Sequence, residues 1–148
     1  GGIDITPALK FNEENRYHSD LEKICNRYDR SYYSKYRKWC DDYFFLKHRN
    51  EARGIGGIFF DYLQTGDWGK DFEFVQDVGS YFQNFVKSTL QALKDEEWSE
   101  DDKEIQLRKR SRYAEFNLLY DRGTKFGLET GGNIDAILMS MPPLAKWD

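Results

Sequence analysis

The chain has 148 residues, of which 32% are charged, and its formal net charge at pH 7 is −4. This length suits one domain with its own core, and the nearly balanced charge argues against a nucleic-acid-binding or membrane-surface protein. No apolar run has the length of a membrane span, and two cysteines make neither a disulfide framework nor a zinc site.

The first part of the sequence predicts a short strand and then two amphipathic helices. The stretch "GGIDITP" is typical of a strand or loop that stops at Pro7, and Asn12 can cap the helix that follows. Ser31 can cap the second helix. The apolar positions recur at helical spacing in both helices, at Tyr17, Leu21, Ile24, Cys25 and Tyr28, and at Tyr32, Tyr36, Trp39, Cys40 and Tyr43. We therefore expect both cysteines to be buried free thiols, as in a reducing compartment, and the 17% of aromatic residues to fill the core.

The middle of the chain combines a charged cluster, a glycine-rich run and two helices. In "KHRNEARGIGGIFFDYL" the glycines precede a predicted strand near residues 55–63, where they would let other groups approach closely. A long helix is predicted from the apolar spacing between Phe72 and Leu93. Another helix begins at Ser99, where Asp102 completes a variant of the capping box. Its acids come first and "RKRSR" comes last, so we interpret that basic run as a solvated helix end.

The last part of the sequence predicts two strands around a long glycine-rich loop. Residues 113–121, "YAEFNLLYD", alternate between two faces, and "DAILMSM", residues 135–141, precedes two prolines. The segment "DRGTKFGLETGGN" between them has the length of a functional or disordered loop. The irregular order of strands and helices favours an α+β fold in which helices cover a mainly antiparallel sheet.

Short motifs alone assign little chemistry. The "GIGG" run lacks the phosphate-loop and dinucleotide-binding spacings, and no GxSxG nucleophile motif is present. His18 and His48 are too few to fill a metal site by themselves. Asp121 can accept N–H donors and Arg122 can clamp a carboxylate, but spacing alone favours a salt bridge or a turn at the strand end as the explanation of that pair.

Several long strings resemble the oxygen-dependent coproporphyrinogen-III oxidases. They are "KWCDDYFFLKHRNEARGIGGIFFDYL" and "RYAEFNLLYDRGTKFGLETGGNIDAILMSMPPLAKW". The stretches "GGIDITP" and "EENRYH" are similar to the GGxDLTP and EEDAxH segments of that family. The matches cover only the second half of the family's usual length. We therefore expect residues 1–148 to form a single domain, the C-terminal half of a larger fold built on a flat antiparallel sheet.

The resemblance implies an activity. Members of the family convert coproporphyrinogen III to protoporphyrinogen IX in haem biosynthesis, using O2 and releasing CO2 and H2O2. They need no organic cofactor, because the electron-rich porphyrinogen itself reacts with O2. A non-catalytic porphyrin-binding or dimerisation fragment is the alternative for this chain. A third hypothesis is a nucleic-acid-binding module built on "RKRSRY", which would bind DNA or RNA in a salt-sensitive way.

The resemblance also implies substrate-site residues. Asp121 corresponds to an acceptor for pyrrole N–H groups, Arg122 to a propionate clamp, and Asp4 to an aspartate that lines the same cavity. The family's GGR substrate segment corresponds to Gly131, Gly132 and Asn133. Asn133 replaces the arginine of that segment, which removes a charge but leaves backbone N–H groups.

Further expectations concern charge, metal and partners. Arg49 and Arg53 could supply positive charge for the tetra-anionic substrate, while His18 and His48 match two histidines that are divalent-metal ligands in bacterial members. The chain departs from the family pattern where Ala52 replaces a basic or polar residue and Tyr62 replaces an aspartate. The region from residue 113 onward resembles a dimerisation segment. We expect a cytoplasmic homodimer, or a mitochondrial intermembrane-space protein in a eukaryote.

Overall fold

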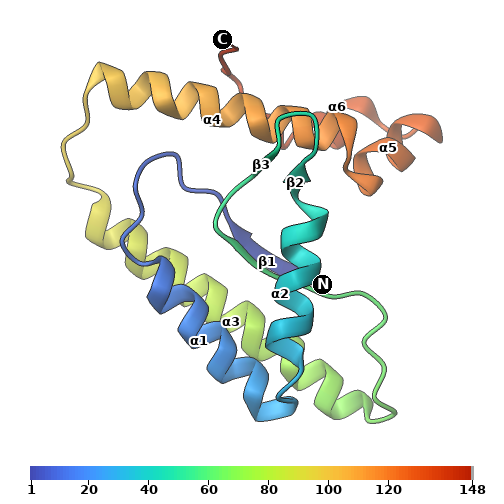
Figure 1. Cartoon of the computed structure of the whole chain (residues 1–148). Coiled ribbons are helices and arrows are strands. Elements are labelled where there is room, and N and C mark those ends of the chain that lie inside the picture. Colours follow the sequence, from blue (N-terminus) through green and yellow to red (C-terminus); the bar gives the residue numbers. More distant parts are fainter. Residues whose placement is uncertain (148) are drawn as a thin grey trace.

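The computed structural model describes residues 1–147. Its strands are short and extended, at Gly2–Ile5 (β1), Phe45–Leu46 (β2), Glu51–Ala52 (β3) and Gly56–Phe59 (β4). Its helices contain most of the chain, at Glu14–Tyr28 (α1), Tyr32–Tyr43 (α2), Trp68–Leu93 (α3), Glu100–Leu119 (α4), Arg122–Glu129 (α5) and Ile134–Leu138 (α6). Figure 1 shows α1, α2 and α3 gathered around β1 and β4, with α4 crossing the opposite side and carrying α5 and α6 at one end.

The strands form two separate antiparallel ribbons. β1 pairs with β4, so that Asp4 faces Gly57, and β2 pairs with β3 in a short hairpin that reaches α4 (Figure 1). A Cβ atom at Gly57 would collide with the carbonyl oxygen of Ile3, so only glycine permits this approach of the two strands. The α+β class is confirmed, whereas a single broad sheet does not occur within residues 1–147.

Aromatic side chains fill the core, as the composition predicts. Tyr17 and Phe74 are almost fully buried, and both cysteines are buried free thiols. The core cluster joins α1, α2, β4 and α3 through Tyr17, Leu21, Ile24, Cys25, Tyr36, Ile58, Phe60, Phe74, Val78 and Phe85. This packing confirms the helical spacing predicted for the first two helices, and in α3 it confirms the predicted core positions at Val78 and Phe85.

The predicted strand at residues 113–121 is wrong, because residues 113–119 continue α4 and Tyr120 and Asp121 form the turn into α5. The predicted capping box starts that helix, with Ser99 and Asp102 bonding each other's backbone, and no glycine or proline interrupts it before Gly123. Its buried residues are Ser111, Ala114, Phe116 and Asn117, and the separation of three residues from the first to the second and from the second to the last places those three on one face of a helix. The basic run, residues 108–112, is therefore not a helix end but lies in the middle of α4.

The predicted glycine-rich loop and the strand after it are also wrong. Asp121 and Asn133 act as N-caps, accepting hydrogen bonds from the amides of Thr124 and Ala136, and so start α5 and α6. The glycines within α5 and the turn at Gly131, where φ is +71°, keep these helices short. Residues 60–67, between β4 and α3, and residues 139–147 form neither helix nor strand.

Candidate functional site

A cavity of about 450 Å³ lies between the β1 strand, the β2–β3 hairpin and α4. Residues from distant parts of the sequence line it, namely Asp4, Thr6, Phe44, Arg53, Tyr113, Phe116, Asn117 and Asp121. Three of the predicted site residues, Asp4, Arg53 and Asp121, therefore face one cavity. Its wall combines aromatic rings with two carboxylates and one guanidinium, which suits a flat, partly charged ligand.

Arg53 is buried among aromatic rings and paired with Asp4. Its guanidinium nitrogen contacts the Asp4 carboxylate, and only 7% of the Arg53 side chain is exposed. The guanidinium carbon lies 3.9 Å from the ring centre of Phe44 and 4.9 Å from that of Phe116, so both rings act as cation–π partners. The Arg53 Nε atom is buried and has no hydrogen-bond acceptor among residues 1–147. Arg53 thus serves first to hold Asp4.

Asp121 is fixed on both carboxylate oxygens at the start of α5. Oδ2 accepts a hydrogen bond of 2.6 Å from the Thr124 amide, and Oδ1 accepts one of 3.1 Å from the Tyr43 hydroxyl. The Asp121 amide itself donates to the carbonyl of Phe116 at the end of α4. The positive end of the α5 dipole also favours a carboxylate here. Asp121 is therefore presented to the cavity in one orientation.

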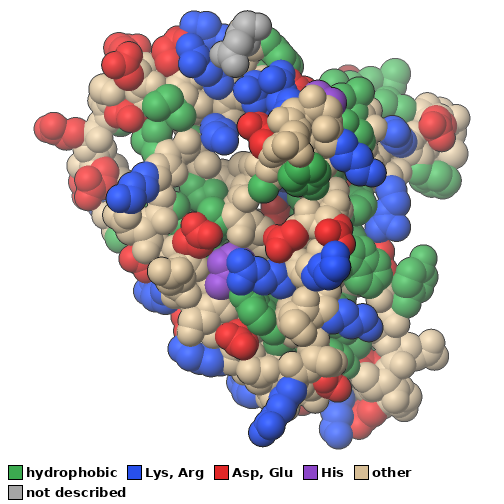
Figure 2. All heavy atoms as spheres, viewed as in Figure 1, with side chains coloured by type: hydrophobic (Ala, Val, Ile, Leu, Met, Phe, Trp, Pro, Cys, Tyr) green, Lys and Arg blue, Asp and Glu red, His purple; other side chains and the backbone are tan. Residues whose placement is uncertain are grey.

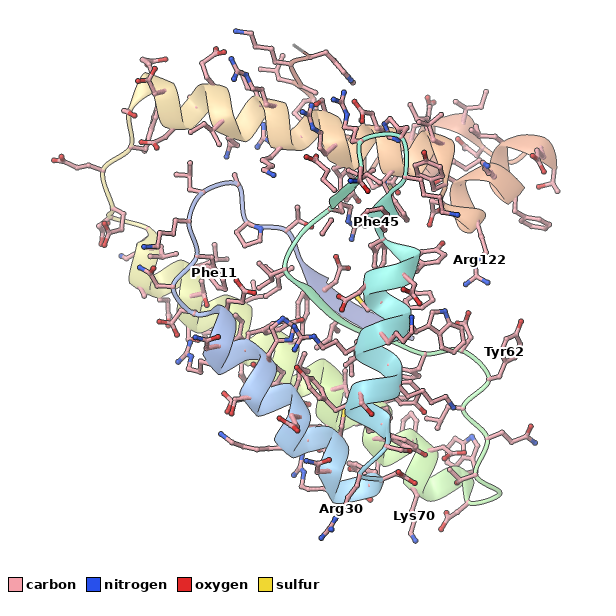
Figure 3. All side chains as sticks on the ribbon, in the orientation of Figure 1. Phe11, Arg30, Phe45, Tyr62, Lys70 and Arg122 are labelled. Atoms are coloured by element: carbon pink, nitrogen blue, oxygen red, sulfur yellow. The ribbon has the colours of Figure 1, made fainter. Side chains whose placement is uncertain are left out.

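Arg122 follows Asp121 directly but lies outside the lining of this cavity. Figure 3 shows its side chain extending from the start of α5 toward the segment that carries Tyr62. Its guanidinium donates to Asp61 at 2.9 Å and lies 5.0 Å from the ring centre of Tyr43. The Tyr43 hydroxyl and the Asp61 carboxylate both raise the pKa of Arg122. More than half of the Arg122 side chain is exposed, so it remains accessible to an anionic group.

Arg49 and His48 belong to a second cluster, where the β2–β3 hairpin meets α4. Arg49 donates to both carboxylate oxygens of Glu115 at 2.5 and 2.6 Å, and the Trp147 indole donates to the same carboxylate at 2.8 Å. His48 lies 2.7 Å from Glu115 and 2.8 Å from the Tyr120 hydroxyl. The Arg49 hydrogen bonds are the main cause of the lowered pKa of Glu115, about 2. This cluster attaches the hairpin to α4.

The predicted substrate segment Gly131, Gly132 and Asn133 forms the turn between α5 and α6. The Gly132 amide donates to the carbonyl of Gly127 at 2.9 Å, and the Asn133 side chain caps α6. None of the three lines the cavity that contains Asp121. Their polar groups stabilise this turn, and the part they play toward a ligand stays a prediction.

A metal ion bound by both histidines does not fit this arrangement. The His18 Nε2 atom lies 2.8 Å from the carbonyl oxygen of Ile55, beneath the glycine-rich segment, whereas His48 is held at α4. Figure 2 shows the two purple side chains apart from each other. Within residues 1–147, no three His, Cys, Asp or Glu side chains gather closely enough to hold a metal ion.

Sequence reasoning missed several residues that build the site. Tyr43 was interpreted only as part of the buried stripe of α2, and Phe44 and Glu115 carried no predicted role. Phe116 was assigned to a strand face. Tyr43 binds Asp121 and Arg122, 78 and 79 residues away, and Glu115 binds Arg49, 66 residues away, so local spacing holds no signal for these contacts.

Acidic and basic side chains mix on the surface, as expected from the nearly balanced charge of the sequence. Figure 2 shows acidic and basic side chains interspersed over the face in view, which is hollowed between α4 and the layer below it. No helix among residues 1–147 has both the length and the apolar character that crossing a bilayer requires.

Comparison with known proteins gives one consistent family. The family described as coproporphyrinogen III oxidase matches residues 1–148. An oxygen-dependent coproporphyrinogen-III oxidase of Rickettsia bellii (strain OSU 85-389) is 51% identical over 99% of this chain. The proteins of that name from Rickettsia rickettsii (strain Sheila Smith) and Rickettsia akari (strain Hartford) are 52% and 51% identical over 100% of it. Each alignment covers 53% of the relative, so the chain spans about half the length of the curated relatives it matches.

Proposed function

The chain belongs to the coproporphyrinogen III oxidase family, and we propose that the full-length protein containing it oxidatively decarboxylates coproporphyrinogen III to protoporphyrinogen IX in haem biosynthesis. The names of the relatives support this reaction. The observation that carries the proposal is the convergence of Asp4, Arg53 and Asp121 on one aromatic-walled cavity. Here, full-length protein means the product of the complete reading frame that includes this chain.

The proposed reaction removes one carboxyl group from each of two propionates. For each side chain, R–CH2–CH2–COO⁻, O2 and H⁺ give R–CH=CH2, CO2 and H2O2. The C–COO⁻ bond breaks, one hydrogen leaves the neighbouring carbon, and O2 accepts the two electrons. The porphyrinogen supplies the electrons, so O2 is the co-substrate and no organic cofactor takes part.

The protein's own part in this reaction is to bind, orient and place charge. Asp121 accepts hydrogen bonds from pyrrole N–H groups, and its fixed carboxylate supports that role. Arg122 binds a propionate, because its guanidinium is exposed beside Asp61. Asp4 adds a second carboxylate to the wall, held by Arg53. No step is assigned to a metal ion, because the two histidines lack a common site.

Local charge makes an anionic substrate compatible with a net charge of −4. Binding depends on the nearby guanidinium groups, whereas net charge mainly affects the approach of the substrate. All three guanidinium groups have a carboxylate partner, but the Arg122 side chain is 59% exposed beside Asp61, whereas those of Arg53 and Arg49 are mostly buried. We therefore place the principal propionate contact at Arg122, with Gly131, Gly132 and Asn133 contributing through the α5–α6 turn.

We extend the proposal to the architecture and setting of the full-length protein. Strands from outside this chain would join the two ribbons into the flat antiparallel sheet expected for the fold. The segment from residue 113 onward would form a homodimer contact, which its exposed apolar side chains support, among them Phe126, Ile134, Met139 and Leu144. Two buried free cysteines support a reducing compartment such as the cytoplasm.

A second candidate is that residues 1–148 act only as a porphyrin-binding or dimerisation module. The half-length coverage of the relatives favours it for this chain alone. The test incubates coproporphyrinogen III in air with the full-length protein and, separately, with the 148-residue chain, and detects vinyl products by fluorescence HPLC. Product from the full-length protein supports the oxidase. Binding without product from the shorter chain assigns the module role to that chain, and no product from either contradicts the oxidase proposal.

A further inference from the structure

We propose that Tyr43 is a positioning residue for the proposed oxidase reaction, because its hydroxyl sets the orientation of Asp121 and of the backbone at Arg122. This inference rests on the function proposed above. It assigns a role to the last residue of α2, which lies outside the cavity lining and which the motifs of the sequence do not single out.

The Tyr43 hydroxyl joins two neighbouring residues that are far from it in sequence. It donates a hydrogen bond of 3.1 Å to Asp121 Oδ1 and accepts one of 3.2 Å from the Arg122 amide. One hydroxyl group thus connects the end of α2 to the first turn of α5 across 78 residues. It uses both its donor and its acceptor capacity in doing so.

The ring of Tyr43 is itself held firmly, so the hydroxyl has little freedom. It stacks on Phe59 of β4 with ring centres 4.7 Å apart and planes inclined by 8°. Phe116 of α4 meets it edge-on at 5.6 Å, and Phe44 lies against it at 4.9 Å. Tyr43 therefore transmits the position of the β1–β4 ribbon and α4 to the Asp121 carboxylate.

Loss of the hydroxyl should change the alignment of Asp121 more than the strength of substrate binding. The Thr124 amide still holds Oδ2, so the α5 cap survives while Oδ1 loses its fixed partner. The ring also remains beneath the Arg122 guanidinium, which keeps its ion pair with Asp61. Small misplacements of an aligned group can lower turnover by about 100-fold, so a fall in kcat of about tenfold with KM nearly unchanged is expected.

The test compares Tyr43→Phe with Tyr28→Phe in the full-length protein. Tyr28 is a matched control, because its hydroxyl also donates to a carboxylate, that of Asp77 at 2.6 Å, on the far side of the core. Steady-state kcat and KM for coproporphyrinogen III are measured for both variants, and circular dichroism and thermal unfolding establish equal folded fractions. The expected result is a kcat loss of about tenfold for Tyr43→Phe alone.

A double variant separates positioning from a general structural effect. In the Asp121→Asn background, adding Tyr43→Phe should lower kcat no further, because the hydroxyl acts through the Asp121 carboxylate. Equal additional losses in both backgrounds, or an unchanged kcat in the single variant, would overturn the inference while leaving the oxidase function standing. A wild-type protein that forms no vinyl product would instead overturn the proposed function, and this inference with it.

Discussion

The Arg53 guanidinium is almost fully buried and pairs with the Asp4 carboxylate at the wall of the cavity that also contains Asp121. Rings of Phe44, Phe116 and Tyr113 surround the guanidinium carbon at 3.9 to 5.5 Å. A buried cation with its own counter-ion and an aromatic cage is poorly placed to leave and bind a substrate carboxylate. Arg53 is therefore better described as the support of Asp4 than as a propionate clamp.

Replacing Arg53 should destabilise the protein. Arg53→Met leaves the Asp4 carboxylate, which is mostly shielded from water, without its partner, and this is expected to lower the free energy of unfolding by about 2 kcal/mol. Urea unfolding of the full-length protein measures this change. The control is Arg16→Met, because Arg16 pairs with Glu13 on an exposed helix surface and such pairs contribute less than about 1 kcal/mol. Equal losses for the two variants would contradict the support role.

The Glu115 cluster predicts a specific acid sensitivity. Hydrogen bonds from Arg49, and then from His48 and Trp147, lower the pKa of Glu115 from 4.5 to about 2. Since the folded protein has the lower pKa, the carboxylate contributes its full stabilisation above about pH 5 and loses it as the pH falls toward 2. Glu115→Gln should therefore destabilise the protein at pH 7 and flatten the fall in stability between pH 5 and 2.

Unfolding free energies at a series of pH values test this expectation. Glu13→Gln is the comparison, because Glu13 is an exposed glutamate with a single arginine partner. If both variants keep the steep wild-type dependence below pH 5, the acid sensitivity comes from other groups and the prediction about Glu115 fails.

Asp121 should matter for turnover through its carboxylate and not merely through its cap. Asp121→Asn is expected to lower kcat about 100-fold or more, because it removes a negative charge that is aligned with the reacting substrate. Asp67→Asn provides the control, because Asp67 caps α3 by accepting from the Lys70 amide at 3.1 Å and lies away from this cavity. Normal turnover by Asp121→Asn would remove this residue from the chemistry.

Arg122 should influence binding more than turnover. Arg122→Ala removes a guanidinium that is accessible beside Asp61, and KM for coproporphyrinogen III is expected to rise about tenfold while kcat changes little. Arg27→Ala is a suitable control, because Arg27 makes a similar ion pair with Asp77 far from the cavity. A lowered kcat at unchanged KM would assign Arg122 a role in the reaction step instead.

The helices around the core could be predicted because their apolar residues recur at helical spacing and nothing interrupts them. In α3, Val78 and Phe85 of the predicted stripe are buried. Phe74, which the stripe did not include, is also buried, whereas Phe72 at the start of the stripe is exposed. The second half of α4 was mispredicted because nine residues rich in aromatic side chains fit a strand alternation as well as a helical one. The capping signals of Asp121 and Asn133 were present but were outweighed by the neighbouring glycines.

The site depended on tertiary contacts that periodicity does not encode. Arg53 reaches Asp4 across 49 residues, and Tyr43 reaches Asp121 across 78, so no local pattern connects them. The resemblance to the oxidases supplied Asp4 and Asp121 as candidates, and the fold brings these two to one cavity. It does not bring Arg49, His18 or His48 there, because hydrogen bonds hold each of them elsewhere.

The release of CO2 from labelled substrate tests the oxidase proposal most directly. Coproporphyrinogen III carrying isotopic label in its propionate carboxyl groups is incubated with the full-length protein in air and, in parallel, under argon. The account predicts two labelled CO2 molecules for each protoporphyrinogen IX formed in air, and neither product under argon. Intact substrate in air, or CO2 release that continues without O2, would contradict it.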